Sequence, residues 1–316
     1  MKSIVITGAT SMIGVALIQQ AIKKNIQVLC LVRKNSTRLN NLPNSDLIQV
    51  EFVDAADYKN VALNIQCDVF YHLTWDKTLG AARDDVDGQI LNIQYTLDAV
   101  RLAQRLGCKK FVGAGSQAEY GIVSEPLKPE TPVNPQSGYG IAKYGAGKLS
   151  HLLCTQLGLS FNWVRILSVF GPFDTSNTLI MYTINELRAG RSPEFTKCEQ
   201  IWDYLYCDNA ANALLIIGEK GLDGKTYPLG SGNGKKLSEY LEILRDIVSP
   251  NTTLQFGKKD YYPHQPMYLC ADISELTADT GWKPEITFGK GEKITPPRRL
   301  FYKIDHFCSY PLQEAA

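Results

Sequence analysis

The stretch Ile4-Val5-Ile6-Thr7-Gly8-Ala9-Thr10-Ser11-Met12-Ile13-Gly14, close to the start of the chain, decides the fold. It joins a run of β-branched residues to a helical pattern through two glycines that five residues separate. A glycine there lets the backbone approach a phosphate group, and the N-terminus of the following helix offers amide hydrogens and partial positive charge. A strand before the motif and a helix after it are the context that dinucleotide binding requires. The predicted phosphate-binding turn consists of Gly8, Thr10, Ser11, Met12, Ile13 and Gly14.

Ser11 stands where a middle glycine is common in such turns. Serine is small and is a favoured helix N-cap, so the turn can keep its shape. Its hydroxyl can also donate a hydrogen bond to a phosphate oxygen. We therefore keep Ser11 among the predicted cofactor contacts.

Short apolar runs alternate with longer helical patterns through the first half of the chain. Runs typical of strands that are buried on both faces occupy residues 4–6, 28–32, 48–53, 69–73 and 111–112. Apolar residues recur at helical spacing over residues 13–24 and 90–107. This alternation predicts an α/β fold: a Rossmann-like, doubly wound parallel sheet with helices on both faces.

The pattern changes after about residue 171, where glycine and proline become frequent and longer loops separate the helical segments. We therefore predict a NAD(P)-binding Rossmann-like domain over residues 1–170. A smaller, mixed substrate-binding lobe over residues 171–316 is predicted to follow, with some segments returning to the sheet. The tail after about residue 289 has weak periodicity, and we assign it no role.

Composition and charge argue against several classes of protein. With 33 Lys+Arg against 32 Asp+Glu, the net charge of +1 gives no bulk attraction for nucleic acid or an anionic membrane, and we expect neither as a partner. The apolar runs are far shorter than the roughly 18 residues of a membrane span. The 8 cysteines form no C-x-x-C pair, so we expect no metal site and no redox dithiol. Without a signal-peptide pattern at Met1, a cytoplasmic protein is favoured.

The end of the second predicted strand distinguishes the two nicotinamide cofactors. An acidic residue there hydrogen-bonds the ribose 2′-hydroxyl of NAD, whereas this chain has Arg33 and Lys34. Two cations suit the 2′-phosphate of NADP, so NADP is favoured and NAD stays possible. The alternative is that Arg33 stacks on the adenine and tolerates either cofactor. Asp54 and Ala55, which close the third strand, can reach the adenine amine, although Asp54 can instead be a turn former.

Tyr139 and Lys143 are four residues apart, just after a proline-rich loop. If a helix begins near Ser137, both side chains lie on one face, one turn apart. A tyrosine that exchanges protons near pH 7 needs its pKa lowered by about three units, and a nearby ammonium together with an oxidised nicotinamide can supply that shift. Ser116, at the end of the fifth strand, can hold a substrate carbonyl, although it can also simply cap its loop. We predict that Ser116, Tyr139 and Lys143 are catalytic.

These motifs together resemble those of the extended short-chain dehydrogenase/reductases, in the NAD-dependent epimerase/dehydratase family. The resemblance covers about residues 1–288 and is highly specific for the superfamily, but it does not define the reaction. Besides the glycine turn and the catalytic residues, the motifs that carry it are Tyr71-His72-Leu73, Asn92, Tyr120-Gly121, Arg165 to Pro172, Trp202 to Tyr206, Asp272-Ile273 and Gly281 to Pro284.

The resemblance implies roles for further residues. Lys143 would also hold the nicotinamide ribose, and Asn92 would be structural. The nicotinamide side would be lined by Leu73, Thr74, Trp75, Ile166 and Ser168. The substrate would be bound by Gln117, Trp75, Ser168, Arg191 and Trp202.

The residues after Ser116 bear on the reaction. Family members that remove water from nucleotide-hexoses carry an Asp and a Glu there, whereas this chain has Gln117 and Ala118, which cannot exchange protons. Glu119 comes one residue too late and would face away if the segment is extended. Dehydration is therefore disfavoured. Two reactions stay open: NADPH-dependent reduction of a keto group on a nucleotide-linked deoxysugar, which Arg33 and Lys34 favour, and NAD-dependent 4-epimerisation.

Two departures from the family pattern concern the substrate. Ser168 and Trp202 replace an Asn and an Arg that help to bind the nucleotide diphosphate, a loss on the order of 1–3 kcal/mol unless another cation compensates. Arg188 and Arg191 can compensate, although a solvated helix face explains them equally well. Alternatively Trp202 stacks on a base, or the substrate is a small ketone or aldehyde without a diphosphate.

A cofactor-sensing regulatory protein is the alternative outside the enzymes. Such a protein needs the glycine turn but has no use for the catalytic residues, so this alternative is disfavoured. Family analogy also implies a homodimer, in which residues 91–100 and 148–157 form a four-helix interface.

Overall fold

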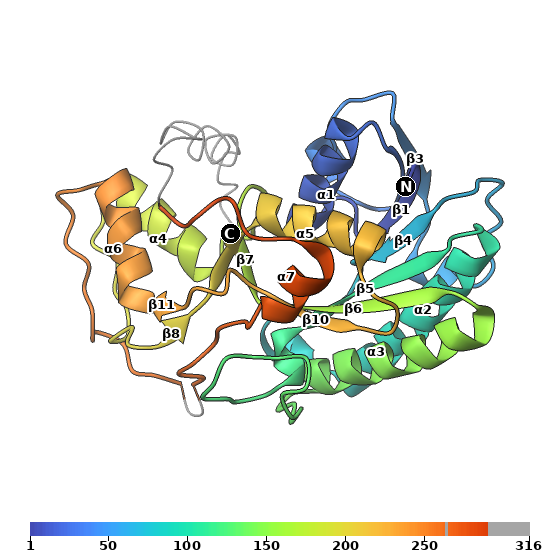
Figure 1. Cartoon of the computed structure of the whole chain (residues 1–316). Coiled ribbons are helices and arrows are strands. Elements are labelled where there is room, and N and C mark those ends of the chain that lie inside the picture. The colour runs from blue at the N-terminus through green and yellow to red at the C-terminus, as the bar shows by residue number, and fades with distance from the viewer. Residues whose placement is uncertain (263–264, 290–316) are drawn as a thin grey trace.

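Seven parallel strands form the central sheet within residues 1–262 and 265–289, the part of the chain that the computed structural model describes (Figure 1). The strand order is β10-β6-β5-β4-β1-β2-β3, and every neighbouring pair is parallel. This is the predicted Rossmann-like doubly wound arrangement. The strands are β1 (Ser3–Thr7), β2 (Gln27–Val32), β3 (Ile48–Phe52), β4 (Val69–His72), β5 (Lys110–Ser116), β6 (Ser160–Ile166) and β10 (Thr226–Leu229).

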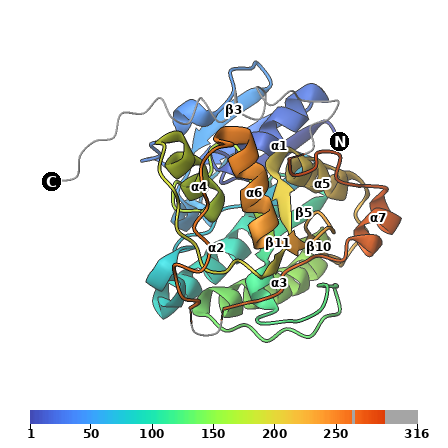
Figure 2. The same cartoon turned by 90° about the vertical axis from the view of Figure 1, so that its left-hand side faces the viewer.

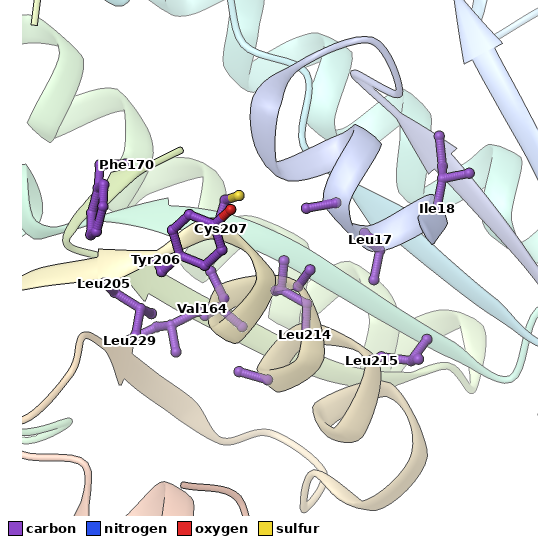
Figure 3. Close-up of a cluster of buried hydrophobic side chains, with 14 of the residues drawn as sticks. Leu17, Ile18, Val164, Phe170, Leu205, Tyr206, Cys207, Leu214, Leu215 and Leu229 are labelled. Carbon is purple, nitrogen blue, oxygen red and sulfur yellow. The ribbon is translucent and has the colours of Figure 1, made fainter. Parts of the chain in front are cut away.

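Burial on both faces explains why the inner strands read as nearly continuous apolar runs. In β1, Ile4 and Ile6 pack into the core on one face, whereas Val5 packs into the core on the other. The two-residue repeat of a strand sends alternate side chains to opposite faces, and here both faces are covered. Figure 3 shows one core, where α1 (Met12–Lys23) and α5 (Cys207–Lys220) cover the sheet.

Helices α2 (Val86–Arg105) and α3 (Gly138–Leu157) pack together on the opposite face (Figure 1). Local sequence sets their ends. The side chains of Asp85 and Ser137 accept hydrogen bonds from backbone amides in the first turns of α2 and α3, which satisfies otherwise unpaired donors. Gly158 closes α3 in the left-handed conformation. The helix predicted from Ser137 is therefore confirmed, with Ser137 as its cap.

The strand pattern missed β6 and did not identify β10, whose Pro228 argues against a strand. β10 is the edge of the sheet and pairs only with β6 in the described residues. Backbone bonds from β6 reach the carbonyls of Lys225 and Leu229, so the alternation of a strand places the nitrogen of Pro228 on the outer side. A missing donor costs little there because no neighbouring strand needs it.

The remaining elements lie beyond the carboxyl ends of the strands and build a lobe around α4 (Leu179–Arg188) and α6 (Leu237–Val248). Figure 2 shows these two helices in front of the sheet. The small elements of the lobe are β7 (Ser168–Phe170), β8 (Ile201–Trp202), β9 (Tyr204–Tyr206) and β11 (Lys235–Lys236). The exception is α7 (Ser274–Thr280), which packs beside α5 and β10 (Figure 1). The part of the second predicted domain from residue 290 onward, and hence the tail, lies outside the described residues.

A single buried carboxylate joins three segments of this region. Asp203 accepts hydrogen bonds from the backbone amides of Ser231, Gly232 and Ala271, at 2.7, 3.1 and 3.1 Å. The Asp203 side chain is fully buried, so water could not take its place as the acceptor for these amides. Asp203 therefore holds β9 beside the loops that follow β10 and precede α7.

In the described ranges, none of the helices combines the length and the apolar character that crossing a membrane requires.

Substitution of Asp203 by Asn tests this junction. The NH2 group of the Asn side chain would face backbone amides that also donate, so at least one of them would lose its acceptor. We therefore expect Asp203→Asn to lower the free energy of unfolding by about 2–4 kcal/mol in urea denaturation. Asp246→Asn is the matched control, because Asp246 is exposed and its ion pair with Arg245 is worth little. Equal stability of the two variants would contradict the role of Asp203.

Candidate active site

A cleft of about 570 Å³ opens at the carboxyl ends of β1 to β4. This edge of a doubly wound sheet is where ligands of such folds bind, and the volume is in the range of small-molecule sites. The predicted cofactor contacts that line it are Gly8, Thr10, Ser11, Arg33, Asp54, Ala55, Leu73, Thr74 and Trp75. Met12, Ile13 and Gly14 do not line the cleft and form the first turn of α1.

The turn after β1 has room for backbone only. Gly8 has a φ of +69°, and a Cβ there would lie 3.0 Å from the carbonyl carbon of Leu73. A Cβ on Gly14 would lie 2.4 Å from the carbonyl oxygen of Gly8. Ser11 caps α1, because its Oγ accepts from the Gly14 amide at 3.1 Å. Its hydroxyl hydrogen stays available, so the turn fits a pyrophosphate at the helix N-terminus.

A buried polar chain holds the loop after β4 against this turn. Thr7 Oγ1 accepts from the amides of Leu73 and Thr74, at 3.1 and 3.3 Å, and contacts His72 Nδ1 at 3.0 Å. Burial lowers the pKa of His72 to about 3, and the Lys143 charge contributes to that lowering. The imidazole is therefore neutral near pH 7 and acts as a spacer under the cleft. The side-chain amide of Asn92 accepts a hydrogen bond from the backbone amide of Asp76 and donates one to its carbonyl, which is the kind of structural role that the resemblance implied.

The two cations predicted for the 2′-phosphate lie in different surroundings. Arg33 lines the cleft, but Lys34 does not, and its ammonium pairs with Asp57 at 2.9 Å. The sequence alone could not show this pair, because Asp57 lies 23 residues further along the chain. Sequence analysis missed the polar residues that do accompany Arg33 in the wall, which are Ser36, Thr37 and Arg38. Asp54 Oδ1 accepts from the backbone amide of Lys34 at 3.1 Å.

Lys143 and Tyr139 both face the end of β5. Lys143 is buried, and its Nζ donates to the carbonyl of Ala114 at 2.6 Å. The same Nζ lies 3.8 Å from the ring centroid of Trp75, a cation–π contact that links Lys143 to the cleft wall. Burial lowers the pKa of Lys143 to about 7, although the charge of Glu119 opposes this.

Tyr139 does not have the lowered pKa that we expected from the lysine. Burial raises the pKa of Tyr139, and a hydrogen bond with Ser116 and the charge of Arg83 only partly offset this. Lys143 Nζ lies 5.9 Å from the tyrosine ring centroid and is engaged by Ala114 and Trp75. The spacing on α3 is as predicted, but the lysine does not supply the expected shift from this position.

Ser116 caps its loop, which is one of the two alternatives that the sequence left open; its role in holding a substrate carbonyl stays a prediction. Its Oγ accepts from the amide of Ala118 at 3.2 Å and so caps a short 3-10 helix, η4 (Gln117–Glu119). The same side chain lies near Tyr139 and lowers the pKa of that phenol. The segment is therefore helical, whereas the prediction that Glu119 faces away assumed an extended segment. Glu119 is fully buried and pairs with Arg165 at 2.7 Å, so it is held in the core by its partners.

The predicted substrate contacts do not form a cationic site. The Trp202 indole donates to Ser168 Oγ at 2.8 Å, so the two departures from the family pattern contact each other. Arg191 is exposed and pairs with Glu186 at 2.6 Å, which fits a solvated ion pair better than a diphosphate contact. Register places Ile166 beside Ser116 in the sheet, and Gln117 follows in η4.

Curated relatives are similar in sequence to this chain over most of their length. dTDP-glucose 4,6-dehydratase of Escherichia coli is 25% identical over 328 residues, which cover 91% of this chain and 91% of the relative. CDP-abequose synthase of Salmonella muenchen is 25% identical over 306 residues, which cover 92% and 96%.

A solved structure shows the same fold. UDP-glucuronic acid 4-epimerase from Bacillus cereus, in complex with UDP-glucuronic acid and NAD, matches with a TM-score of 0.81 at 20% identity and covers 96% of this chain and 99% of that one. The model of the NAD-dependent epimerase/dehydratase family matches residues 4–230. The chain therefore belongs to the NAD-dependent epimerase/dehydratase family, whose members are enzymes of the extended short-chain dehydrogenase/reductase type.

Proposed function

We propose that the protein is an NADPH-dependent reductase of a keto group on a nucleotide-linked deoxysugar. The observation that carries the proposal is that Ser116 and Tyr139 lie together at the end of β5, beside Trp75 in the cleft wall. Ser116 lowers the pKa of Tyr139, and the ring centroids of Trp75 and Tyr139 are 6.1 Å apart. The residues that follow Ser116 in η4 lack the acid–base pair of a dehydratase. Gln117 and Ala118 occupy the positions where the dehydrating members carry carboxyl groups.

Ser116, Tyr139 and Lys143 have different roles in the proposed reaction. Ser116 Oγ already accepts from Ala118, so its own hydrogen can be donated to a substrate carbonyl oxygen. Tyr139, beside Ser116, gives a proton to that oxygen and is re-protonated from solvent. A bound nicotinamide supplies the hydride. Lys143, with a pKa of about 7, carries a positive charge in part of the molecules at neutral pH and can hold a ribose hydroxyl.

Arg33 and Arg38 in the cleft wall support NADP over NAD. Both are exposed cations on the loop after β2, and Ser36 and Thr37 add hydroxyl donors between them. A phosphate dianion accepts such charge-assisted bonds, whereas a ribose hydroxyl gains less from two cations. NAD stays possible, because the B. cereus structure was solved with NAD.

NAD-dependent 4-epimerisation is the second candidate, because 4-epimerases are among the solved structures that share the fold of this chain. Epimerisation uses the same Tyr–Ser pair but keeps its cofactor, since the hydride returns to the same sugar. The cofactor that is retained on purification separates the two: stoichiometric NAD supports the epimerase, whereas a site that turns over added NADPH supports the reductase.

The substrate proposal rests on the relatives, whose names include dTDP-glucose and CDP-abequose. The Trp202–Ser168 pair leaves an indole where the family has a cation. Trp202 is half-buried and its NH is engaged, so its ring is held in place and can stack on a base. A small ketone or aldehyde without a diphosphate is the alternative substrate.

We also propose a homodimer through α2 and α3. These helices pack against each other, and both expose large apolar side chains that a contact between copies would bury. The exposed residues are Ile90, Leu91, Ile141, Leu149 and Leu152. Sedimentation of the purified chain as a monomer would overturn this proposal.

Tyr139→Phe tests the proton donor. We expect turnover of NADPH with a nucleotide-linked keto sugar to fall by at least about two orders of magnitude, because the general acid is lost. Cofactor affinity, measured by fluorescence titration, should stay nearly unchanged. Tyr144→Phe, on the same helix, is the control and should keep wild-type turnover. Normal turnover by Tyr139→Phe would remove this residue from the mechanism.

Arg33→Asp tests the choice of cofactor. The new carboxylate repels a 2′-phosphate and accepts from a ribose hydroxyl, so we expect the NADP/NAD affinity ratio to fall by about tenfold or more. Lys34→Ala is the matched control, because its ammonium pairs with Asp57 outside the cleft wall. An unchanged ratio in Arg33→Asp would mean that the 2′-phosphate is recognised elsewhere.

The pKa of Lys143 predicts how stability depends on pH. The folded chain loses this proton near pH 7, whereas an unfolded lysine keeps it to about 10.4, so the contribution of Lys143 becomes more favourable as pH rises from 7. Between pH 7 and 9 the free energy of unfolding of the wild type should rise by about 2 kcal/mol relative to Lys143→Met. Urea denaturation at several pH values measures this. The exposed Lys148→Met should give a flat difference, and a flat difference for Lys143→Met would contradict the assignment.

A further inference from the structure

A second cation lies against the tyrosine of the site. The guanidinium carbon of Arg83 is 4.7 Å from the ring centroid of Tyr139, closer than Lys143 Nζ at 5.9 Å. Arg83 belongs to the 3-10 helix η3 (Gly80–Asp84), in the connection between β4 and α2. Neither the catalytic spacing nor the family motifs had indicated this residue.

A side-chain hydrogen bond and a close backbone approach hold η3 against the helix that carries Tyr139. Asp84 Oδ1 accepts from the amide of Gly138, in the first turn of α3, at 2.8 Å. The approach is close, because a Cβ on Gly138 would lie 3.1 Å from the carbonyl oxygen of Arg83. Arg83 is therefore presented to the tyrosine ring by an anchored turn.

The charged groups around Tyr139 come from three elements. η3 contributes Arg83 and Asp84, η4 contributes Glu119, and α3 contributes Lys143. Arg83 lowers the pKa of Tyr139, whereas Glu119 and burial raise it. Since Lys143 is engaged by Ala114 and Trp75, Arg83 is the cation that acts on the phenol in this arrangement.

We propose that Arg83 is a positioning residue for Tyr139: its guanidinium packs on the ring, fixes the ring's orientation and stabilises the phenolate left when the proton is donated. A phenolate has a more electron-rich ring than a phenol, so a cation over the ring face attracts it more strongly. The inference rests on the proposed role of Tyr139 as proton donor, and it deepens that role.

The test compares Arg83→Gln and Arg83→Lys with the wild type in the full-length chain. The ionisation of Tyr139 is followed by NMR of ¹³C-labelled tyrosine, with the signal assigned by its loss in Tyr139→Phe. We expect Arg83→Gln to raise the titration midpoint by about 0.5–1 pH unit and Arg83→Lys to restore most of the shift. Arg101→Gln on α2 removes an exposed arginine paired with Asp98 and should leave the midpoint unchanged.

Turnover gives the second readout. We expect Arg83→Gln to lower kcat about tenfold, with the dissociation constant of NADPH changed less than twofold. The alkaline limb of the kcat profile, where Tyr139 loses the proton that it must donate, should move to higher pH by the same shift as the NMR midpoint. An unmoved midpoint in Arg83→Gln, or an Arg83→Lys variant that behaves like Arg83→Gln, would overturn the inference.

The two proposals fail differently. If Tyr139→Phe keeps full turnover, the proposed function itself is wrong. If Tyr139→Phe is inactive while Arg83→Gln has a normal midpoint and kcat, only the role of Arg83 is wrong. Unfolding of Arg83→Gln would be detected by circular dichroism, and Arg83→Lys, which keeps the charge, then decides the outcome.

Discussion

The close approach of backbone to backbone at Gly8 is the constraint on which the site depends. β1 ends there against the loop after β4, and α1 begins against the carbonyl of Gly8, so a side chain at either glycine would push the elements apart. The helix N-terminus, the Thr7–His72 chain and the cleft are consequently held in one arrangement by packing at a single point. Precise placement of this kind is what binding a charged cofactor requires.

The electrostatics of the site are distributed more widely than a Tyr–Lys pair implies. Lys143 is buried beneath Trp75 with a pKa of about 7, and Tyr139 has a raised pKa beside it. Burial disfavours the charged form of each group, so neither is fully prepared for proton exchange by the other. Arg83 over the phenol ring and the hydroxyl of Ser116 oppose that effect, so η3 and the end of β5 both influence the charge of Tyr139.

Periodicity and motif spacing predicted the sheet, the glycine turn and the helix of Tyr139, because these follow from local contacts and burial on two faces. The features that were missed depend on residues far apart in the chain. Lys34 is paired by Asp57, Trp202 is paired by Ser168, and Arg83 meets Tyr139 from another loop. No short window of sequence contains both partners of these contacts. β10 was not predicted because a proline such as Pro228 is acceptable only in an edge strand, and whether a strand lies at the edge depends on the assembled sheet.

The proline in β10 also restricts how molecules of this protein can associate. An open sheet margin is normally a template on which a foreign strand can dock, and aggregation often starts there. On this margin the outward-facing position of Pro228 has no amide hydrogen, so an incoming strand would find a gap in its ladder. Growth by strand addition is thereby disfavoured at this end.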